Sequence, residues 1–256
     1  MNIKILGAHN CETREYGHTC FVIDDVLAVD AGSLTSNLSI EEQKNLQAVI
    51  LSHRHYDHIR DITAFGANLY YSGTSVDIYA SQDVIDTLNE HFFTSGIYTN
   101  LAEKPPDNPT LRLNVIESLR IYNIEGYEIT PVPVNHINLT TGFKIVSPKD
   151  KQLFYTSDTG PGLKECWENV SPNLLIIEVT ENNLSGECAE KPGHLTPNLL
   201  KQELISFKEI NGYLPDVVAV HMNPLMEEDI TRELSLVEDE LDCRITPGYE
   251  GMEIIL

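Results

Sequence analysis

Residue types that bind metals gather in one short segment, His53–His58, which reads His-Arg-His-Tyr-Asp-His and follows a short apolar run. On an extended chain, residues two positions apart project to the same side, so His53 and His55 can hold one ion. Asp57 and His58, where the chain turns toward a predicted helix, can face a second ion. Imidazole and carboxylate ligands suit zinc, iron or manganese. A polar loop that merely contains histidines is the alternative, but three of the chain's nine histidines fall within these six residues.

Two ions need more ligands than this segment supplies, and three later residues can supply them. Each lies where a predicted strand gives way to a loop, which is the usual place for a site on an α/β scaffold. The three are His136, Asp158 and His221, which follow the apolar runs 129–134, 153–156 and 217–220. Any one of them alone also fits an ordinary strand-end polar residue or a helix N-cap. Together they complete a two-metal site, in which Asp158 is suited to bridge both ions.

The elements that must position these residues alternate between strands and helices. Short apolar runs bounded by turn residues predict strands at 3–6, 20–23, 26–29, 48–51, 129–134, 143–146, 153–156, 174–179 and 217–220. Helices are predicted after Asp57, over Gln82–His91 and over Thr196–Ile210, where Thr196 is a candidate cap and Pro197 lies in the first turn. The alternation indicates one α/β domain over residues 1–256, whose two halves share a core.

Residues 92–118 break this pattern, because they contain Glu-Lys-Pro-Pro-Asp-Asn-Pro at 103–109 and few periodic signals. We interpret them as a surface insertion. A lid, a subunit-contact arm that helps to build a homodimer, and a plain solvated connection all remain open.

The charge balance narrows the substrate class. The chain carries 39 acidic and 17 basic residues, for a formal net charge of -22, which repels the phosphate backbone of a nucleic acid. Bound divalent metals can reverse the sign locally, so a small anionic substrate stays compatible with this acidity. The five cysteines form no Cys-x-x-Cys pair and predict no disulfide framework. With no signal peptide and no apolar run near the roughly 20 residues that span a bilayer, we expect a cytoplasmic protein without membrane contact.

The seven candidate ligands resemble, in their order and spacing, the signature of the metallo-β-lactamase superfamily. They are His53, His55, Asp57, His58, His136, Asp158 and His221. The resemblance covers nearly the whole chain and implies the αββα four-layer sandwich, an α/β fold, with two divalent metal ions at one edge. It also implies that Asp30, in Leu-Ala-Val-Asp-Ala-Gly, orients the metal-binding loop. A plain turn aspartate is the alternative.

Further features resemble the phosphodiesterase branch of that superfamily, which contains tRNase Z and the class II cyclic-nucleotide phosphodiesterases. The bridging position holds Asp158, unlike the cysteine of the zinc β-lactamases, and the second ligand is His55, unlike the glutamate of the flavodiiron oxygen reductases. Glu178-Val-Thr and Gly-His194-Leu-Thr-Pro resemble the paired motifs of the branch, the latter being closer to the class II enzymes. The resemblance implies that His194, helped by Glu178, donates a proton to a leaving alkoxide. A helix cap is the alternative role for His194.

These parts predict a dinuclear-metal phosphodiesterase that hydrolyses a small phosphodiester, first of all a 3',5'-cyclic nucleotide to the nucleoside 5'-monophosphate. The two ions would share a hydroxide that Asp57 ligates and orients, and His194 would act as general acid. We expect zinc, with manganese and iron as alternatives. The residues that bind the rest of the substrate are not identified.

Two other functions remain open. A tRNase Z-like endoribonuclease would use the same catalytic residues, but the net charge and the lack of a basic Gly-rich arm count against it. A non-hydrolytic di-metal sensor or oxygen-binding protein would keep the metals without turnover, yet no expected ligand or proton donor is missing. Tyr56 stands where the class II motif has leucine, and Arg60 and Asp61 form a polar pair after the motif. Because of these differences, the sequence defines the identity of the substrate less well than the type of reaction.

Overall fold

Two mixed β-sheets face each other in the computed structural model, which describes residues 1–256 except 95, 97, 187–190 and 192. Both sheets are seven-stranded over the described residues. The first has the order β14 (Glu253–Ile255), β1 (Asn2–Gly7), β2 (Cys20–Ile23), β3 (Leu27–Val29), β4 (Ala48–Leu51), β5 (Val76–Ala80) and β6 (Leu111–Val115). The second has the order β13 (Ile245–Pro247), β12 (Asp216–Val220), β11 (Leu174–Glu178), β10 (Gln152–Tyr155), β9 (Thr141–Val146), β8 (Tyr127–Pro133) and β7 (Tyr122–Ile124).

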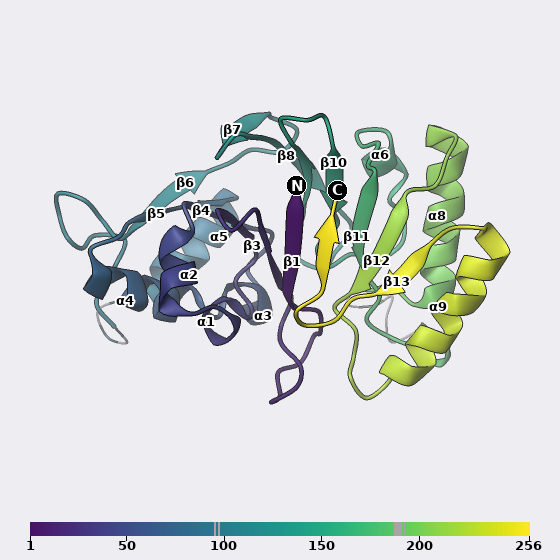
Figure 1. Ribbon diagram of the computed structural model, residues 1–256, viewed down its shortest axis with the longest axis horizontal. Coiled ribbons are helices and arrows are strands. Elements are labelled where there is room, and N and C mark those ends of the chain that lie inside the picture. The colour runs from purple at the N-terminus through teal and green to yellow at the C-terminus, as the bar shows by residue number, and fades with distance from the viewer. Residues whose placement is uncertain (95, 97, 187–190, 192) are drawn as a thin grey trace.

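Helices cover the outer face of each sheet, which gives the molecule four layers (Figure 1). Those beside the first sheet are α1 (Leu34–Asn37), α2 (Ile40–Asn45), α3 (Tyr56–Ile59), α4 (Ile62–Ser72), α5 (Gln82–Thr87) and the π-helical turn η1 (Leu88–Phe92). Those beside the second are α6 (Lys164–Trp167), the 3-10 turn η2 (Asn183–Ser185), α8 (Pro197–Asn211) and α9 (Glu227–Leu241). The αββα sandwich is therefore confirmed.

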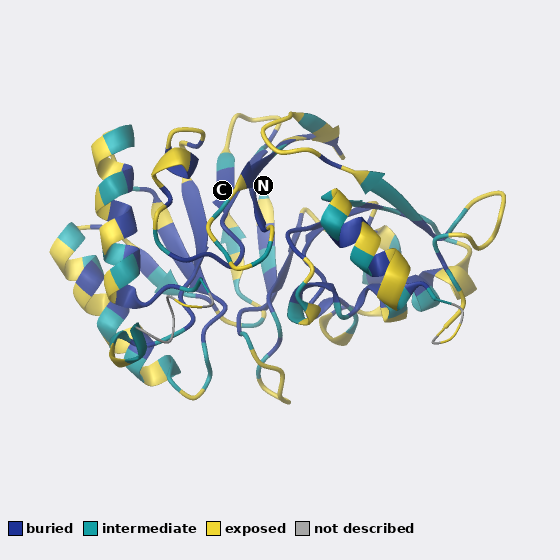
Figure 2. Ribbon diagram, turned by 180° about the vertical axis from the view of Figure 1, so that it is seen from behind, coloured by how far each residue is buried: buried dark blue, intermediate teal, exposed yellow. Residues whose placement is uncertain are grey.

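Strand residues alternate between two apolar layers because successive side chains point to opposite faces of a sheet. In β2, Phe21 packs between the sheets together with Ile50 and Tyr155, whereas Cys20 and Val22 pack under the helices of the first sheet. The central strands and the inner helix faces are correspondingly the most buried parts of the molecule (Figure 2). The layer between the sheets thus takes side chains from both halves of the chain.

Every strand predicted from an apolar run is present within two residues of its predicted bounds, but other elements differ from the prediction. β6 lies inside residues 92–118 and pairs in parallel with β5, so part of the segment interpreted as a surface insertion is an edge strand of the first sheet. Its pattern is weak because Leu111 is buried while Val115 is exposed. The helix predicted over Gln82–His91 changes at Leu88 into a π-helical turn.

The cysteines of the described chain are free thiols, in line with their scattered spacing. They are Cys11, Cys20, Cys166 and Cys243. Cys188 lies outside the described residues. Across the parts of the chain that the structure describes, no helix combines the length and the apolar character that crossing a bilayer requires.

The loop 8–19 between β1 and β2 is fastened to the C-terminal segment by Glu250. One carboxylate oxygen of Glu250 accepts hydrogen bonds from the backbone N–H groups of Ala8 (3.1 Å) and Gly17 (2.9 Å). The same oxygen lies 2.8 Å from Nδ1 of the buried His9. Since hydrogen bonds to a charged acceptor are the strong ones, Glu250 fixes both ends of this loop.

Glu250→Gln is expected to destabilise the fold by about 1–3 kcal/mol, because it replaces a partly buried charged acceptor of three hydrogen bonds with a weaker neutral one. Burial alone would raise the pKa of Glu250, but the hydrogen bonds from His9 and the backbone outweigh it and lower the pKa. The stabilisation is therefore present above the ordinary pKa of a glutamate and is lost as the pH falls through the lowered value. Urea unfolding at about pH 7 and about pH 3 measures this, on either side of the ordinary value. An equal difference between variant and wild type at both pH values would contradict this role.

Candidate metal centre

The predicted metal ligands and Glu178 meet at one edge of the sandwich because each lies at or after the end of a strand. β8, β10, β11 and β12 run in the same direction in the second sheet, and such strands bring their carboxyl ends to the same edge. β4 of the first sheet leads into α3, which lies at the lower edge of the sheets in Figure 1. These strand ends carry His53–His58, His136, Asp158, Glu178 and His221.

His53, His55, His136 and Asp158 form the first ligand group. Nε2 of His53 lies 3.6 Å from Oδ2 of Asp158, and Nε2 of His136 lies 4.0 Å from the same oxygen. Nδ1 of His55 lies 3.3 Å from Nε2 of His136. The four candidate ligand atoms lie within 4.8 Å of one another, so a single ion could contact all of them after small adjustments.

Asp57, His58, Asp158 and His221 form the second ligand group. Oδ1 of Asp158 lies 3.2 Å from Nε2 of His58 and 3.4 Å from Nε2 of His221. Oδ2 of Asp57 lies 3.1 Å from Nε2 of His221. Asp158 therefore belongs to both groups, with one carboxylate oxygen toward each.

Several buried atoms of these groups lack hydrogen-bond partners. Nε2 of His53, Nε2 of His58 and Oδ1 of Asp158 are buried, yet none forms a hydrogen bond. An unpaired buried polar group costs about 1–3 kcal/mol, and a divalent cation would satisfy all three atoms. Burial also lowers the pKa of His53 and His136, which favours the neutral imidazole that binds metals. The side chains present therefore fit divalent metal ions.

Asp30 contacts one histidine of the second group directly and reaches one histidine of the first group through Ser52. Its carboxylate accepts hydrogen bonds from the backbone N–H and the hydroxyl of Ser52 and from the hydroxyl of Tyr155, each at 2.8 Å, and lies 2.7 Å from Nδ1 of His58. The Ser52 hydroxyl in turn lies 3.1 Å from Nδ1 of His53. With Nδ1 of both histidines held in this way, Nε2 faces the ligand groups. Asp30 was predicted from its motif, whereas Ser52 and Tyr155 were not predicted from the sequence.

Glu178 and His194 form a hydrogen-bonded pair beside both groups. Nδ1 of His194 lies 2.7 Å from Oε1 of Glu178, and the His194 ring centre lies 5.2 Å from that of His136 and 5.5 Å from that of His221. Burial alone would lower the pKa of His194, but the charge of Glu178 and the hydrogen bond to it raise the pKa to about 9. His194 is therefore protonated at neutral pH and can donate a proton.

Thr180 connects this pair to the second ligand group. Its hydroxyl lies 2.8 Å from Oε2 of Glu178 and 2.8 Å from Nδ1 of His221. A hydroxyl can donate to the carboxylate and accept from the imidazole, which leaves Nε2 of His221 toward Asp57 and Asp158. The Glu-Val-Thr motif contained this residue, but its role depends on a partner 41 positions away in the chain.

His18 also lies beside the site, near Asp57. Gly32 permits the approach, because a Cβ at that position would lie 2.2 Å from the backbone oxygen of Asp57 and 2.6 Å from Cβ of His18. His9 is buried and contacts Glu250, which holds the loop 8–19, whereas His91 is exposed. His18 is therefore the one of these three histidines that the close approach at Gly32 brings beside the second ligand group.

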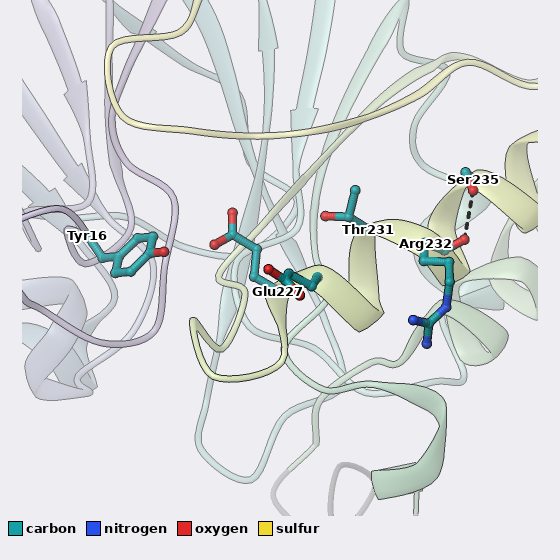
Figure 3. A pocket seen from close by; sticks show the side chains of 6 residues that line it. Tyr16, Glu227, Thr231, Arg232 and Ser235 are labelled. Atoms are coloured by element: carbon teal, nitrogen blue, oxygen red, sulfur yellow. Dashed lines mark hydrogen bonds between the residues drawn. The ribbon is translucent and has the colours of Figure 1, made fainter.

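A pocket of about 550 Å³ lies outside both ligand groups, between the loop 8–19 and α9. Tyr16 and Glu227 stand on its two walls, and Thr231 and Arg232 extend along α9 (Figure 3). Glu228 also lines it, so carboxylates outnumber the single guanidinium. This charge disfavours an anionic substrate in the pocket.

The family model described as "Beta-lactamase superfamily domain" matches residues 21–222 of the chain. The chain belongs to the beta-lactamase superfamily. This superfamily member is 24% identical over 237 residues to a protein of Yersinia pestis named "Probable 3',5'-cyclic-nucleotide phosphodiesterase". The alignment covers 84% of this chain and 66% of the Yersinia protein, so the chain spans slightly under two thirds of that relative's length.

Solved structures show the same fold at low sequence identity. Unliganded yeast PDE1 has a TM-score of 0.86 and 19% identity, over 100% of this chain and 99% of the other. The short form of human tRNase Z has a TM-score of 0.68 and 16% identity, over 100% of this chain and 99% of the other. This superfamily fold and the buried His and Asp groups fit a metal-dependent hydrolase.

Proposed function

We propose that this superfamily member is a phosphodiesterase that hydrolyses a 3',5'-cyclic nucleotide to the nucleoside 5'-monophosphate. The observation that carries the proposal is the Glu178–His194 pair, which lies beside the two groups of candidate metal ligands and can supply a proton donor there. A proton donor suits a substrate whose leaving oxygen departs poorly as an anion, as the ribose 3'-oxygen does. The name of the Yersinia relative supports the same substrate class.

We assign the two ligand groups to two divalent ions that share Asp158. His53, His55 and His136 complete the first site, and Asp57, His58 and His221 complete the second. When bound, such ions neutralise phosphate charge and make a water molecule more acidic. We expect zinc in both sites, and manganese or iron accept the same ligand types.

The chain's own side chains then supply orientation and protons. Glu178 holds Nδ1 of His194, which leaves Nε2–H to donate. Hydrolysis breaks the bond between phosphorus and the 3'-oxygen, and the His194 proton passes to that oxygen as it leaves. Burial alone would raise the pKa of Asp57, but His58 and His221 lower it, so Asp57 stays ionised and can accept a hydrogen bond from the attacking water. Water contributes a hydroxyl to phosphorus, and its released proton returns through solvent to His194.

Electrostatics favour a small substrate over a polymer. The formal net charge is -22, and a long RNA would interact with the whole acidic surface. A cyclic nucleotide carries one negative charge and would interact mainly with the metal sites, where bound cations reverse the sign. We therefore expect the substrate to be a small anionic phosphodiester.

Metal-replete protein incubated with 3',5'-cyclic AMP is expected to release AMP with its phosphate on the 5'-oxygen, because His194 assists departure of the 3'-oxygen. Chromatography against both AMP isomers measures this, and chelator-treated protein is the control. A precursor tRNA and bis-p-nitrophenyl phosphate are assayed in parallel. Cleavage of the tRNA without turnover of cyclic AMP would overturn the substrate class. A protein that holds two ions but turns over none of the three substrates would instead be a non-hydrolytic di-metal protein.

A further inference from the structure

In the part of the chain that the structure describes, no strand pairs with the outer edge of β6, which is the last strand of the first sheet (Figure 1). On the inner edge of β6, the N–H of Ile116 donates to the backbone oxygen of Ala80 in β5 at 2.9 Å. Along a parallel strand, the backbone groups of successive residues point alternately to one side and to the other. The even-numbered residues of β6 therefore bond to β5, and the odd-numbered residues direct their N–H and C=O groups outward.

Only the beginning of this outer edge is covered. The N–H of Leu111 donates outward to the backbone oxygen of Leu101 at 3.1 Å. Among the described residues, no backbone hydrogen bond covers Leu113 or Val115 in the same way. A row of unpaired backbone groups on an edge strand is a template for pairing with another chain.

Apolar side chains are exposed beside this free edge. The exposed fraction is 45% for Val115, 54% for Leu119 and 62% for Ile121. These residues lie at the end of β6 and in the segment that leads to β7, the edge strand of the second sheet. We call residues 113–121 the edge surface. Exposed apolar side chains that gather in this way mark interaction sites, whereas single ones are ordinary.

Leu119 has a backbone conformation that a leucine rarely adopts. Its φ is 62°, in the left-handed region where a Cβ atom is crowded. Its N–H donates to the backbone oxygen of Pro131 in β8 at 2.7 Å, which holds the turn in place. Glycine or asparagine would adopt this φ with less strain, and a side chain that is mostly exposed adds little to the core. Contact with a partner gives this leucine a role that the single chain does not.

The charge of this segment favours a second copy of the chain as the partner. With a formal net charge of -22, two copies repel each other over most of their surfaces. Residues 108–124, however, contain two arginines and one glutamate. The exposed Arg120 and Glu117 lie 3.5 Å apart, and across a two-fold axis each can also pair with its opposite in the partner subunit. Two copies can therefore meet here with little repulsion.

The pattern of β6 is also complementary to itself. When two copies of β6 run antiparallel about a two-fold axis at Asn114, Leu113 lies opposite Val115 of the partner subunit, and Val115 lies opposite the partner's Leu113. In such pairs the two residues exchange both of their backbone hydrogen bonds. Leu113 packs against the apolar layer under the helices of the first sheet, so Val115 of the partner subunit extends that layer.

We infer that the edge surface is the contact between two copies of this chain, with β6 paired antiparallel to β6 of the partner subunit. The first sheets of the two copies then form one continuous sheet. A two-fold contact uses the same surface on both copies, so the assembly closes at a dimer. The edge surface contains none of the candidate metal ligands, and the inference does not depend on the proposed function.

Sedimentation velocity of wild type is expected to show a change from monomer to dimer between about 1 μM and about 1 mM, the range in which a small interface dissociates. Val115→Lys is expected to raise the dissociation constant at least about tenfold, because a lysine on an edge strand opposes pairing. Leu236→Lys changes an exposed leucine of α9 and is the matched control, which should dimerise as wild type does. Since either lysine reduces the repulsion between two acidic chains, weaker association of Val115→Lys alone reports the lost contact.

Leu119→Asn separates loss of the interface from damage to the fold. It is expected to raise the dissociation constant as well, because an exposed apolar contact is removed. At a concentration where wild type is monomeric, its thermal unfolding midpoint should equal or exceed that of wild type, since asparagine adopts the left-handed conformation more readily than leucine.

A wild type that stays monomeric over the whole concentration range overturns the inference. A dimer that keeps the wild-type dissociation constant in Val115→Lys or in Leu119→Asn overturns it too, because the two copies would then meet at another surface.

Discussion

Asp158→Ala is expected to lose bound metal and hydrolytic activity together. Oδ1 of Asp158 faces His58 and His221, and Oδ2 faces His53 and His136. The substitution therefore removes a ligand from both proposed ions at once. Activity is expected to fall by at least about a thousandfold, because bound metals supply several kcal/mol of transition-state stabilisation.

Metal content per chain after dialysis, measured by inductively coupled plasma mass spectrometry, tests this expectation alongside the rate. Wild type should hold two ions and Asp158→Ala fewer than one. Asp239→Ala removes an exposed carboxylate from α9 and is the matched control. It should keep both ions and the full rate. An Asp158→Ala protein that retains two ions and turns over substrate would show that the ions do not share this carboxylate.

His194→Ala is expected to keep both ions and to lose about a hundredfold or more in kcat with cyclic AMP, the usual contribution of a general acid. His194 is outside both proposed ligand groups, so its removal leaves every assigned ligand in place. Its hydrogen bond to Glu178 and its position near His136 and His221 make it the proton donor of the proposed reaction.

The leaving group provides the sharper test of this role. The p-nitrophenolate of bis-p-nitrophenyl phosphate departs without a proton, so the loss caused by His194→Ala should be much smaller with that substrate than with cyclic AMP. His91→Ala, at an exposed histidine of η1, is the control for loss of an imidazole. Equal losses with both substrates, or loss of metal from His194→Ala, would assign His194 a structural role.

The candidate ligands could be found from the sequence because their spacing carries the information. His53 and His55 are two positions apart after a strand, and the structure brings both into one group with His136. Asp158 and His221 lie where apolar runs end, and strands of one direction end at the same edge. The layered fold was implied by the family resemblance rather than by periodicity. That these residues bind metal remains a prediction.

Contacts that depend on distant partners could not be predicted. Ser52, Thr180 and Asn138 are ordinary polar residues, and only the packing of the two sheets selects the imidazole that each one contacts. The edge strands β6 and β14 were missed for a related reason, since each has few buried side chains and depends on backbone pairing with its neighbour.

The two ligand groups draw on both sheets, since His53–His58 follow β4 of the first sheet while Asp158 and His221 follow strands of the second. An ion bound there would join the halves of the sandwich and bind only the folded chain. At a free concentration 100 times its Kd, one such ion would stabilise the native state by about 2.7 kcal/mol. Metal starvation would then leave more of the chain open to proteolysis. Metal supply would thus govern the amount of this protein in the cell as well as its catalytic rate.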